Sequence, residues 1–245
     1  FGDAWQNQWS SVDNASRASF HNDTGLMLPA PPIQPDWSDE AWLKFVEWRY
    51  EQILDFVRDF YNAMKAANPD CKLIIETSSD GGVHMTQIGC SIIDMPNNCD
   101  VIAHEYTGPV YEVQYYTWLH MLSTLKLWHD FDKNASWLLS YVEKGRVNLA
   151  RFHAALVLTM GFNYYTSGGE GMAEIVDEQF MHDFFGWLKE HDDYFYEWDS
   201  NADIAVVFSR HTLDYLDRGS WEEYAYHDEF LGILMMLIES NIPFK

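Results

Sequence analysis

Two stretches decide the fold, Lys72-Leu-Ile-Ile-Glu-Thr-Ser78 and Asp100-Val-Ile-Ala-His-Glu-Tyr106. Each is a short apolar run bounded by polar or turn-forming residues, a pattern typical of a buried strand. Similar runs follow at 136–141 and 161–167. Longer helical segments separate the runs, and strands that alternate with helices form parallel sheets because each helix returns the chain to its starting edge. The sequence therefore predicts an α/β protein with a parallel sheet.

Helical periodicity fills the segments between the predicted strands. Apolar residues recur at three- and four-residue steps from Asp39 to Met64, and Asn68-Pro69-Asp70 ends this helix. Further helices are expected at 110–128, 149–159 and 174–191. Residues 1–40, up to the start of the long helix, are expected to form a loop because Gly, Asn, Ser and Pro are frequent there.

The spacing of the units indicates the architecture. Each strand and its helix span roughly 30–35 residues, as in (β/α)₈ barrels. Four strands do not close a barrel, so residues 1–198 are predicted to hold the later strands of a TIM barrel; a doubly wound open sheet is the alternative. A strand expected at 203–209 and a helix at 226–240 predict that residues 199–245 begin a second α/β domain. Because the chain starts at Phe1 and stops where a further element is due, we expect an internal piece of a longer protein.

Composition excludes several classes of function. The chain has 15 Lys plus Arg against 38 Asp plus Glu, a net charge of −23, so no basic face for nucleic acid or for an anionic membrane is expected. No apolar run is long enough to span a membrane. Cys71, Cys90 and Cys99 match no zinc-ligand spacing; free thiols are expected, with a Cys90–Cys99 disulfide as the alternative. No metal constellation and no cofactor-binding motif is present.

Carboxylates follow the predicted strands at the positions where barrels place their chemistry. Glu76 and Glu105 stand near the carboxyl ends of two strands, and Asp3 stands where an earlier strand would end. A carboxylate at the end of an apolar strand is costly unless it is paired or used. Glycoside hydrolysis needs two such groups, one to protonate the leaving oxygen and one to attack the anomeric carbon or activate water. The alternative is a salt bridge to an inward-pointing Arg or Lys.

Aromatic and polar residues near the same strand ends predict a sugar site, because a flat ring covers the apolar face of a pyranose. The residues expected to shape this site are Trp5, Trp9, His84, His104, Tyr141 and Tyr164. His104 is adjacent to Glu105, so in a regular strand the two should face opposite ways. Two pairs of histidines at nine-residue spacings, His120 with His129 and His182 with His191, are expected to lie on helix surfaces.

Two segments carry a family resemblance. Ser16-Arg-Ala-Ser-Phe-His-Asn-Asp-Thr-Gly-Leu-Met-Leu-Pro29, followed by Trp42-Leu-Lys-Phe-Val-Glu-Trp-Arg-Tyr-Glu51, resembles the region after the fourth barrel strand in a hypothetical glycosyl hydrolase group related to glycoside hydrolase family 42. In that group a cysteine-rich CYCxxC stretch leads into a helix of the F-x-x-x-x-G type. Here Val12-Asp-Asn-Ala-Ser16 stands in place of the cysteines.

A second resemblance concerns the end of the chain. Asn201-Ala-Asp-Ile-Ala-Val-Val-Phe-Ser209, with Gly232 and Asn241-Ile-Pro-Phe244, looks like the opening of the family's trimerisation domain, a glutamine-amidotransferase-like α/β fold. The resemblance therefore implies a homo-oligomer, a trimer when intact. It also numbers the barrel strands: Phe1-Gly-Asp3 would end strand four, and Glu76, Glu105, Tyr141 and Tyr164 would mark strands five to eight.

The resemblance implies a function, with two departures from the family pattern. Clan relatives place their acid/base glutamate after strand four and their nucleophile after strand seven, whereas this chain has Asp3 at the first place and Ser140-Tyr141, with Glu143 displaced, at the second. We therefore expect a β-galactosidase-like O-glycoside hydrolase with Asp3 as nucleophile or stabiliser and Glu105 or Glu76 as general acid/base. The alternative is a barrel that binds carbohydrate without cleaving it.

Overall fold

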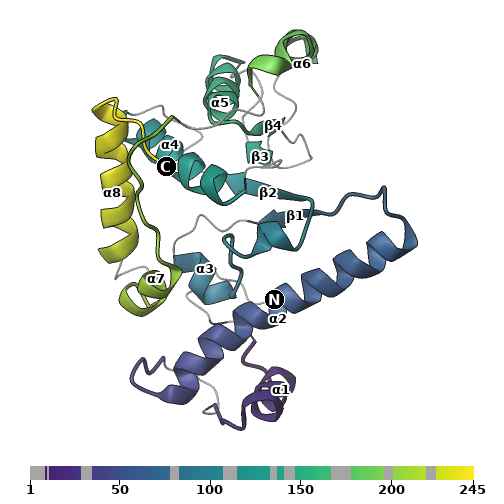
Figure 1. Ribbon diagram of the computed structural model, residues 1–245, viewed down its shortest axis with the longest axis vertical. Coiled ribbons are helices and arrows are strands. Elements are labelled where there is room, and N and C mark those ends of the chain that lie inside the picture. Colours follow the sequence, from purple (N-terminus) through teal and green to yellow (C-terminus); the bar gives the residue numbers. More distant parts are fainter. Residues whose placement is uncertain are drawn as a thin grey trace. The chain divides into compact units, whose positions relative to one another are not determined.

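The computed structural model describes residues 9, 11–28, 35–77, 83–106, 115–132, 137–140, 147–166, 178–195, 201–218 and 225–245. Its helices are α1 (Asn14–Thr24), α2 (Glu40–Ala67), α3 (Val83–Ile88), α4 (Tyr115–Phe131), α5 (Val147–Thr159), α6 (Glu178–His191), α7 (Arg210–Leu216) and α8 (Ala225–Glu239) (Figure 1). Its strands are β1 (Ile74–Thr77), β2 (Val101–Tyr106), β3 (Trp137–Ser140) and β4 (Asn163–Thr166). The chain forms two compact units: residues 1–73, 79–99 and 208–230, and residues 74–78, 100–207 and 231–245.

The second unit contains a sheet of four parallel strands in the order β1-β2-β3-β4. All four lie within the runs predicted to be strands, so these predictions are confirmed. Neighbouring strands pair in a regular register that aligns Glu76 with Ala103, then Trp137, then Asn163. Strands adjacent in sequence are therefore adjacent in space, and the parallel sheet follows from the alternation of strands and helices. Whether further strands close it into a barrel stays a prediction.

One face of this sheet is covered by helices. His104 of β2 stacks on Trp128 of α4 with ring centroids 4.2 Å apart. Tyr164 of β4, in the same register row, meets Phe184 of α6 edge-on at 5.8 Å. Ala150 of α5 belongs to a buried cluster with residues of α6. Because His104 and Tyr164 occupy the same face, α4 and α6 pack on the same side of the sheet.

The first unit is organised around α2, which begins and ends as predicted. Asp39 caps its first turn, accepting a hydrogen bond from the backbone N–H of Ala41 at 3.0 Å, and Asn68 follows its last residue. The predicted apolar face is buried only in the first half of the helix and at one position beyond it. Phe56 and Phe60 in the second half are exposed, so the periodicity identified the helix correctly but not how much of its face is covered.

Helix α1 lies within the segment expected to be a loop, and that expectation is wrong there. Asp13 caps it by accepting hydrogen bonds from the backbone N–H groups of Ala15 and Ser16 at 2.9 and 3.1 Å. Gly25, at φ 75°, ends it in the left-handed conformation that glycine adopts freely. Phe20 is buried against Phe45 and Trp48 of α2. The helix is mostly polar and is held by one aromatic side chain, so it has no apolar periodicity to reveal it.

The last part of the chain differs from the expected strand and helix. Residues 203–209 form no strand; Ile204 makes an isolated parallel bridge with Phe244, and Lys245 donates a backbone hydrogen bond to the carbonyl of Ile204 at 2.9 Å. Helix α7 was not expected, whereas α8 was. Neither unit begins at residue 199, and the second domain and its trimer stay predictions. Among the helices that the structure describes, none is long and apolar enough to cross a membrane.

Candidate functional site

Glu76 and the backbone position of Glu105 lie on the face of the sheet opposite the helices. Side chains alternate along a strand, so Ile74 and Glu76 share this face while Thr77 lies on the helix-covered one. Ile74 and Glu76 are exposed, and Thr77 is buried. Glu76 aligns with Ala103, and Glu105 stands two residues further along β2. Residues two apart in a strand belong to the same face of the sheet, so position 105 shares the face of Ala103 and of position 76. This face is the one away from α4 and α6.

The two positions also share an edge of the sheet. Glu76 and Glu105 are each the last residue but one of their strand, at the carboxyl end of parallel neighbours. With strands about 4.8 Å apart and a rise of about 3.3 Å per residue, their Cα atoms are about 8 Å apart. Glu76 makes no ion pair with any residue that the structure describes. Within those residues, the alternative of a salt bridge to an inward-pointing Arg or Lys is not observed for Glu76.

Several predicted site residues cannot be placed. Asp3, Trp5 and Tyr141 lie outside the described residues. The backbones of His84, in α3, and Glu105, in β2, are described, but their side chains are not. Of the carboxylates predicted to be catalytic, the structure therefore describes the side chain of Glu76, together with the backbone position of Glu105.

His104 and Tyr164 lie on the opposite face from Glu76. Both are buried. Burial lowers the pKa of His104 to about 3, so its imidazole is neutral near pH 7 and packs as an aromatic ring. Neither ring nitrogen of His104 has a hydrogen-bond partner among the described residues. The structure therefore does not bring these two predicted sugar-site residues together with Glu76.

Trp9 belongs to an aromatic cluster in the first unit. Its ring meets Trp42 edge-on at 4.7 Å and Trp37 at 6.0 Å, and the guanidinium of Arg49 lies 5.1 Å from its centroid. Trp42 and Arg49 are fully buried residues of α2. The described contacts of Trp9 are thus those of a ring that covers α2, in the unit that does not contain β1.

A buried polar network in the first unit was not predicted. Asp214 of α7 accepts hydrogen bonds from the hydroxyls of Tyr50 on α2, at 2.8 Å, and Thr86 on α3, at 2.6 Å. Arg210 donates to Asp94 at 2.8 Å and to Glu47 at 3.1 Å, and its Nε lies 3.8 Å from Asp214. Burial raises the pKa of Asp214 to about 6.

The chemistry of this network fits a structural role. A buried carboxyl with a shifted pKa is one mark of a functional group, but Asp214 has no exposed surface and both donors to it come from neighbouring helices. The network therefore joins α2, α3 and α7. Sequence reasoning missed it because Tyr50 and Asp214 are 164 residues apart and neither belongs to a recognisable motif.

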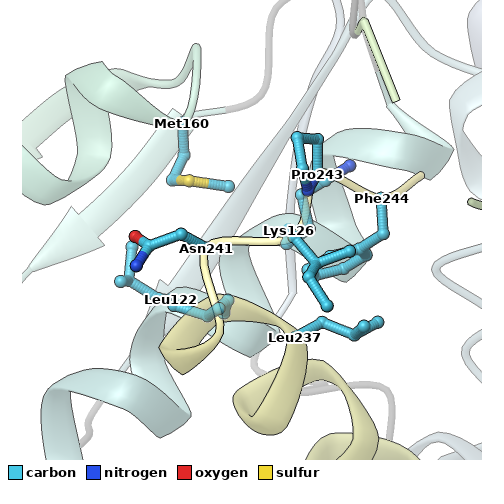
Figure 2. Close-up of a pocket in the computed structure, with 9 residues that line it drawn as sticks. Leu122, Lys126, Met160, Leu237, Asn241, Pro243 and Phe244 are labelled. Carbon is cyan, nitrogen blue, oxygen red and sulfur yellow. The ribbon is translucent and has the colours of Figure 1, made fainter. Parts of the chain in front are cut away.

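A pocket of about 390 Å³ lies in the second unit, also without a sequence signal. Its lining comes from α4, from Met160 after α5, from the end of α8 and from residues 241–244 (Figure 2). Most of it is apolar; Lys126 is paired with Asp130 at 2.6 Å, and its amine lies 5.5 Å from the ring of Phe244. The amide of Asn241 is the other polar group in the lining. With no carboxylate in its lining, this pocket does not suit glycoside hydrolysis.

The described residues hold no group of three or more His, Cys, Asp or Glu side chains that could bind a metal ion. No disulfide joins Cys90 and Cys99, so the alternative of a pairing between them is not observed. Comparisons of the chain with family models, with curated proteins and with solved structures found no match.

Proposed function

We propose that the chain belongs to a (β/α)-barrel glycoside hydrolase that cleaves an O-glycosidic bond with Glu76 and Glu105 as its carboxyl pair. The observation that carries the proposal is the placement of both positions at the carboxyl ends of adjacent parallel strands, on the face away from the helices. Active sites of (β/α)₈ barrels form at this end of the strands. The proposal depends on the exposure of Glu76, because a catalytic carboxyl must reach a solute.

The arrangement of helices favours a barrel wall over a doubly wound sheet. Doubly wound sheets carry helices on both faces. Here α4 and α6 both pack on the face that holds His104 and Tyr164. Four parallel strands in sequential order, with α4 and α6 on the same side, are what a segment of barrel wall would present.

The spacing suits paired-carboxylate chemistry. Retaining glycosidases hold their carboxyl groups about 5–5.5 Å apart and inverting ones about 6.5–9.5 Å apart. Glutamates whose Cα atoms are about 8 Å apart reach either range through their rotamers. One carboxyl would protonate the leaving oxygen, and the other would attack the anomeric carbon or activate water. Asp3 stays in the proposal as a third carboxylate, placed by the sequence at the end of an earlier strand and by the family resemblance at strand four.

The test is hydrolysis of a panel of 4-nitrophenyl glycosides, beginning with the β-galactoside. Glu76→Gln and Glu105→Gln each keep the side-chain shape and remove the acid, so each should lower kcat/KM by about 10²–10⁴-fold. Glu190→Gln, on the exposed surface of α6, makes the same chemical change away from the sheet and should leave the rate unchanged. Full activity in both sheet variants would contradict the proposal.

A carbohydrate-binding barrel without catalysis is the second candidate. It is favoured by the placement of His104 and Tyr164 on the covered face, which leaves fewer polar groups beside Glu76, and by the absence of glutamate at the family's usual catalytic positions. If the wild-type protein turns over no glycoside but binds one, and Glu76→Gln weakens that binding, the binding function is the correct one.

A further inference from the structure

Helix α1 forms one wall of a second pocket, of about 340 Å³, in the first unit. α1 is the first helix of the chain, coloured purple (Figure 1). The pocket is lined by Asn14, Arg17, Ala18 and His21 of this helix and by Met27 and Leu28. Positions three, four and seven residues apart fall on one face of a helix, so the four helical residues form a continuous wall.

The guanidinium of Arg17 brings a positive charge to the lining of this pocket. Arg17 donates one hydrogen bond, to the backbone carbonyl of Leu28 at 2.6 Å. Among the described residues it makes no ion pair with a carboxylate, although acids outnumber Lys and Arg by 38 to 15. Lys44, Arg58, Lys126 and Arg210 each have a carboxylate partner. Arg218 resembles Arg17 in donating to a backbone carbonyl, that of Tyr215, but it does not line this pocket.

The acids closest to Arg17 on its own helix are engaged elsewhere. Asp13, one turn earlier, accepts hydrogen bonds from backbone N–H groups at the start of α1 and from the hydroxyl of Ser16 at 2.7 Å. Asp23 accepts a hydrogen bond from the indole N–H of Trp48 at 2.8 Å. Within the part of the chain that the structure describes, no acidic residue lines the pocket. Neither Asp13 nor Asp23 pairs with the guanidinium, which can therefore pair with an anion that enters from solution.

We propose that this pocket binds a small organic molecule bearing a carboxylate. The carboxylate pairs with Arg17, and Asn14 and His21 supply hydrogen-bonding groups beside it. Ala18, Met27 and Leu28 give the rest of the lining an apolar character that suits the body of an organic acid. A phosphate group fits less well, because the pocket offers one permanently charged side chain and space well beyond a small ion. The proposal is independent of the hydrolase activity proposed above.

The test is a calorimetric titration of the purified protein at constant ionic strength with sodium glucuronate, glucose and inorganic phosphate. Glucuronate and glucose share a ring and differ in the carboxylate, so glucuronate alone should bind at this pocket. Arg17→Met should weaken glucuronate at least tenfold. Ala18→Trp fills the pocket and keeps the Arg17–Leu28 hydrogen bond, so it should do the same. Ser19→Trp, an exposed neighbour that does not line the pocket, is the matched control and should bind as the wild type does.

The outcomes separate this site from the carboxylates of the sheet. Glucuronate binding that survives Ala18→Trp but disappears in Glu76→Gln would place the ligand at the sheet and overturn the proposal. Tighter binding of phosphate than of glucuronate, equal binding of glucose, or no binding of any probe would overturn it as well. A thermal melt of each variant confirms that it is folded, and Ala18→Trp decides the matter if Arg17→Met is destabilised by the lost hydrogen bond.

Discussion

The two faces of the sheet differ in their exposure to solvent, although adjacent residues of the same strands form them. One face buries its side chains under helices, and the other exposes Ile74 and Glu76. On the helix-covered face, Thr77 and His104 are 6% and 1% exposed, and His104 lies flat against Trp128. On the other face, Ile74 is 42% exposed and Glu76 is exposed too. Burial makes the first face a packing surface, where even a histidine acts as an aromatic ring. Only the second face presents a carboxylate to a solute.

We expect the largest loss of stability from a substitution in the helix-covered face of the sheet. Trp128→Ala removes a fully buried ring that stacks on His104 and should lower the free energy of unfolding by about 3–5 kcal/mol. Trp187→Ala is the matched control, because Trp187 is 46% exposed on the outside of α6; it should cost under about 1.5 kcal/mol. Denaturant unfolding of both variants measures the difference. Equal losses would mean that α4 does not hold this face.

Asp214 is a second buried ionisable group and differs from His104 in having hydrogen-bond partners among the described residues. Its pKa is raised from 3.8 to about 6 by burial, opposed by hydrogen bonds from Thr86 and Tyr50 and by the charge of Arg210. The folded state therefore holds a proton that the unfolded state releases between pH 3.8 and 6, and stability falls as the pH rises through this window.

The corresponding variant is Asp214→Asn, which cannot release that proton. Between pH 4 and pH 7, the wild type should lose about 2–3 kcal/mol of unfolding free energy relative to Asp214→Asn. Denaturant unfolding at the two pH values measures this difference. A constant difference between the two proteins across the range would show that Asp214 titrates normally.

For His104 we expect the opposite pH dependence of stability. Its pKa is lowered from 6.5 to about 3 by burial, so the unfolded state binds a proton that the folded state refuses, and stability falls as the pH drops below 6.5. Relative to His104→Leu, the wild type should lose about 2 kcal/mol between pH 7 and pH 5. His153, whose pKa is also lowered by burial, is present in both proteins and cancels. Parallel pH profiles would place His104 in contact with water.

The smallest effect on stability should come from the open face. Glu76→Gln replaces an exposed group without an ion pair among the described residues, so the free energy of unfolding should change by less than about 0.5 kcal/mol. The same variant is expected to lose glycosidase activity. A large loss of stability would mean that Glu76 has a structural partner, and it would contradict the interpretation of Glu76 as an exposed catalytic carboxylate.

The strands and the long helix were predictable because the pattern of apolar and polar residues within each segment is sufficient to identify it. Short apolar runs ending in polar residues identified β1 to β4. That His104 and Glu105 face opposite ways stays a prediction, because the side chain of Glu105 lies outside the described part of the chain. The ends of α2 followed from Asp39 and Asn68, which cap and stop a helix by their own chemistry. The shared position of Glu76 and Glu105 needed one further step, the parallel register, which also follows from the alternation of strands and helices.

Features that depend on distant partners were not predictable. The Asp214 network joins three helices through residues that are far apart in the sequence. Helix α1 has a single buried side chain, Phe20, so its periodicity is polar and weak. The position of His104 near a strand end predicts a residue of the sugar site, whereas in the structure it stacks on Trp128 in the packed face. A single sequence does not reveal which side chain a buried polar group will meet.

The most direct test of the central claim is a crystal structure of the protein with a bound saccharide, in which the distance between the carboxyl carbons of Glu76 and Glu105 is measured. We predict a separation of about 5–10 Å, with a sugar ring against the face opposite α4 and α6. Carboxyl groups that are ion-paired to Lys or Arg, or that point away from each other while the saccharide binds elsewhere, would contradict the account.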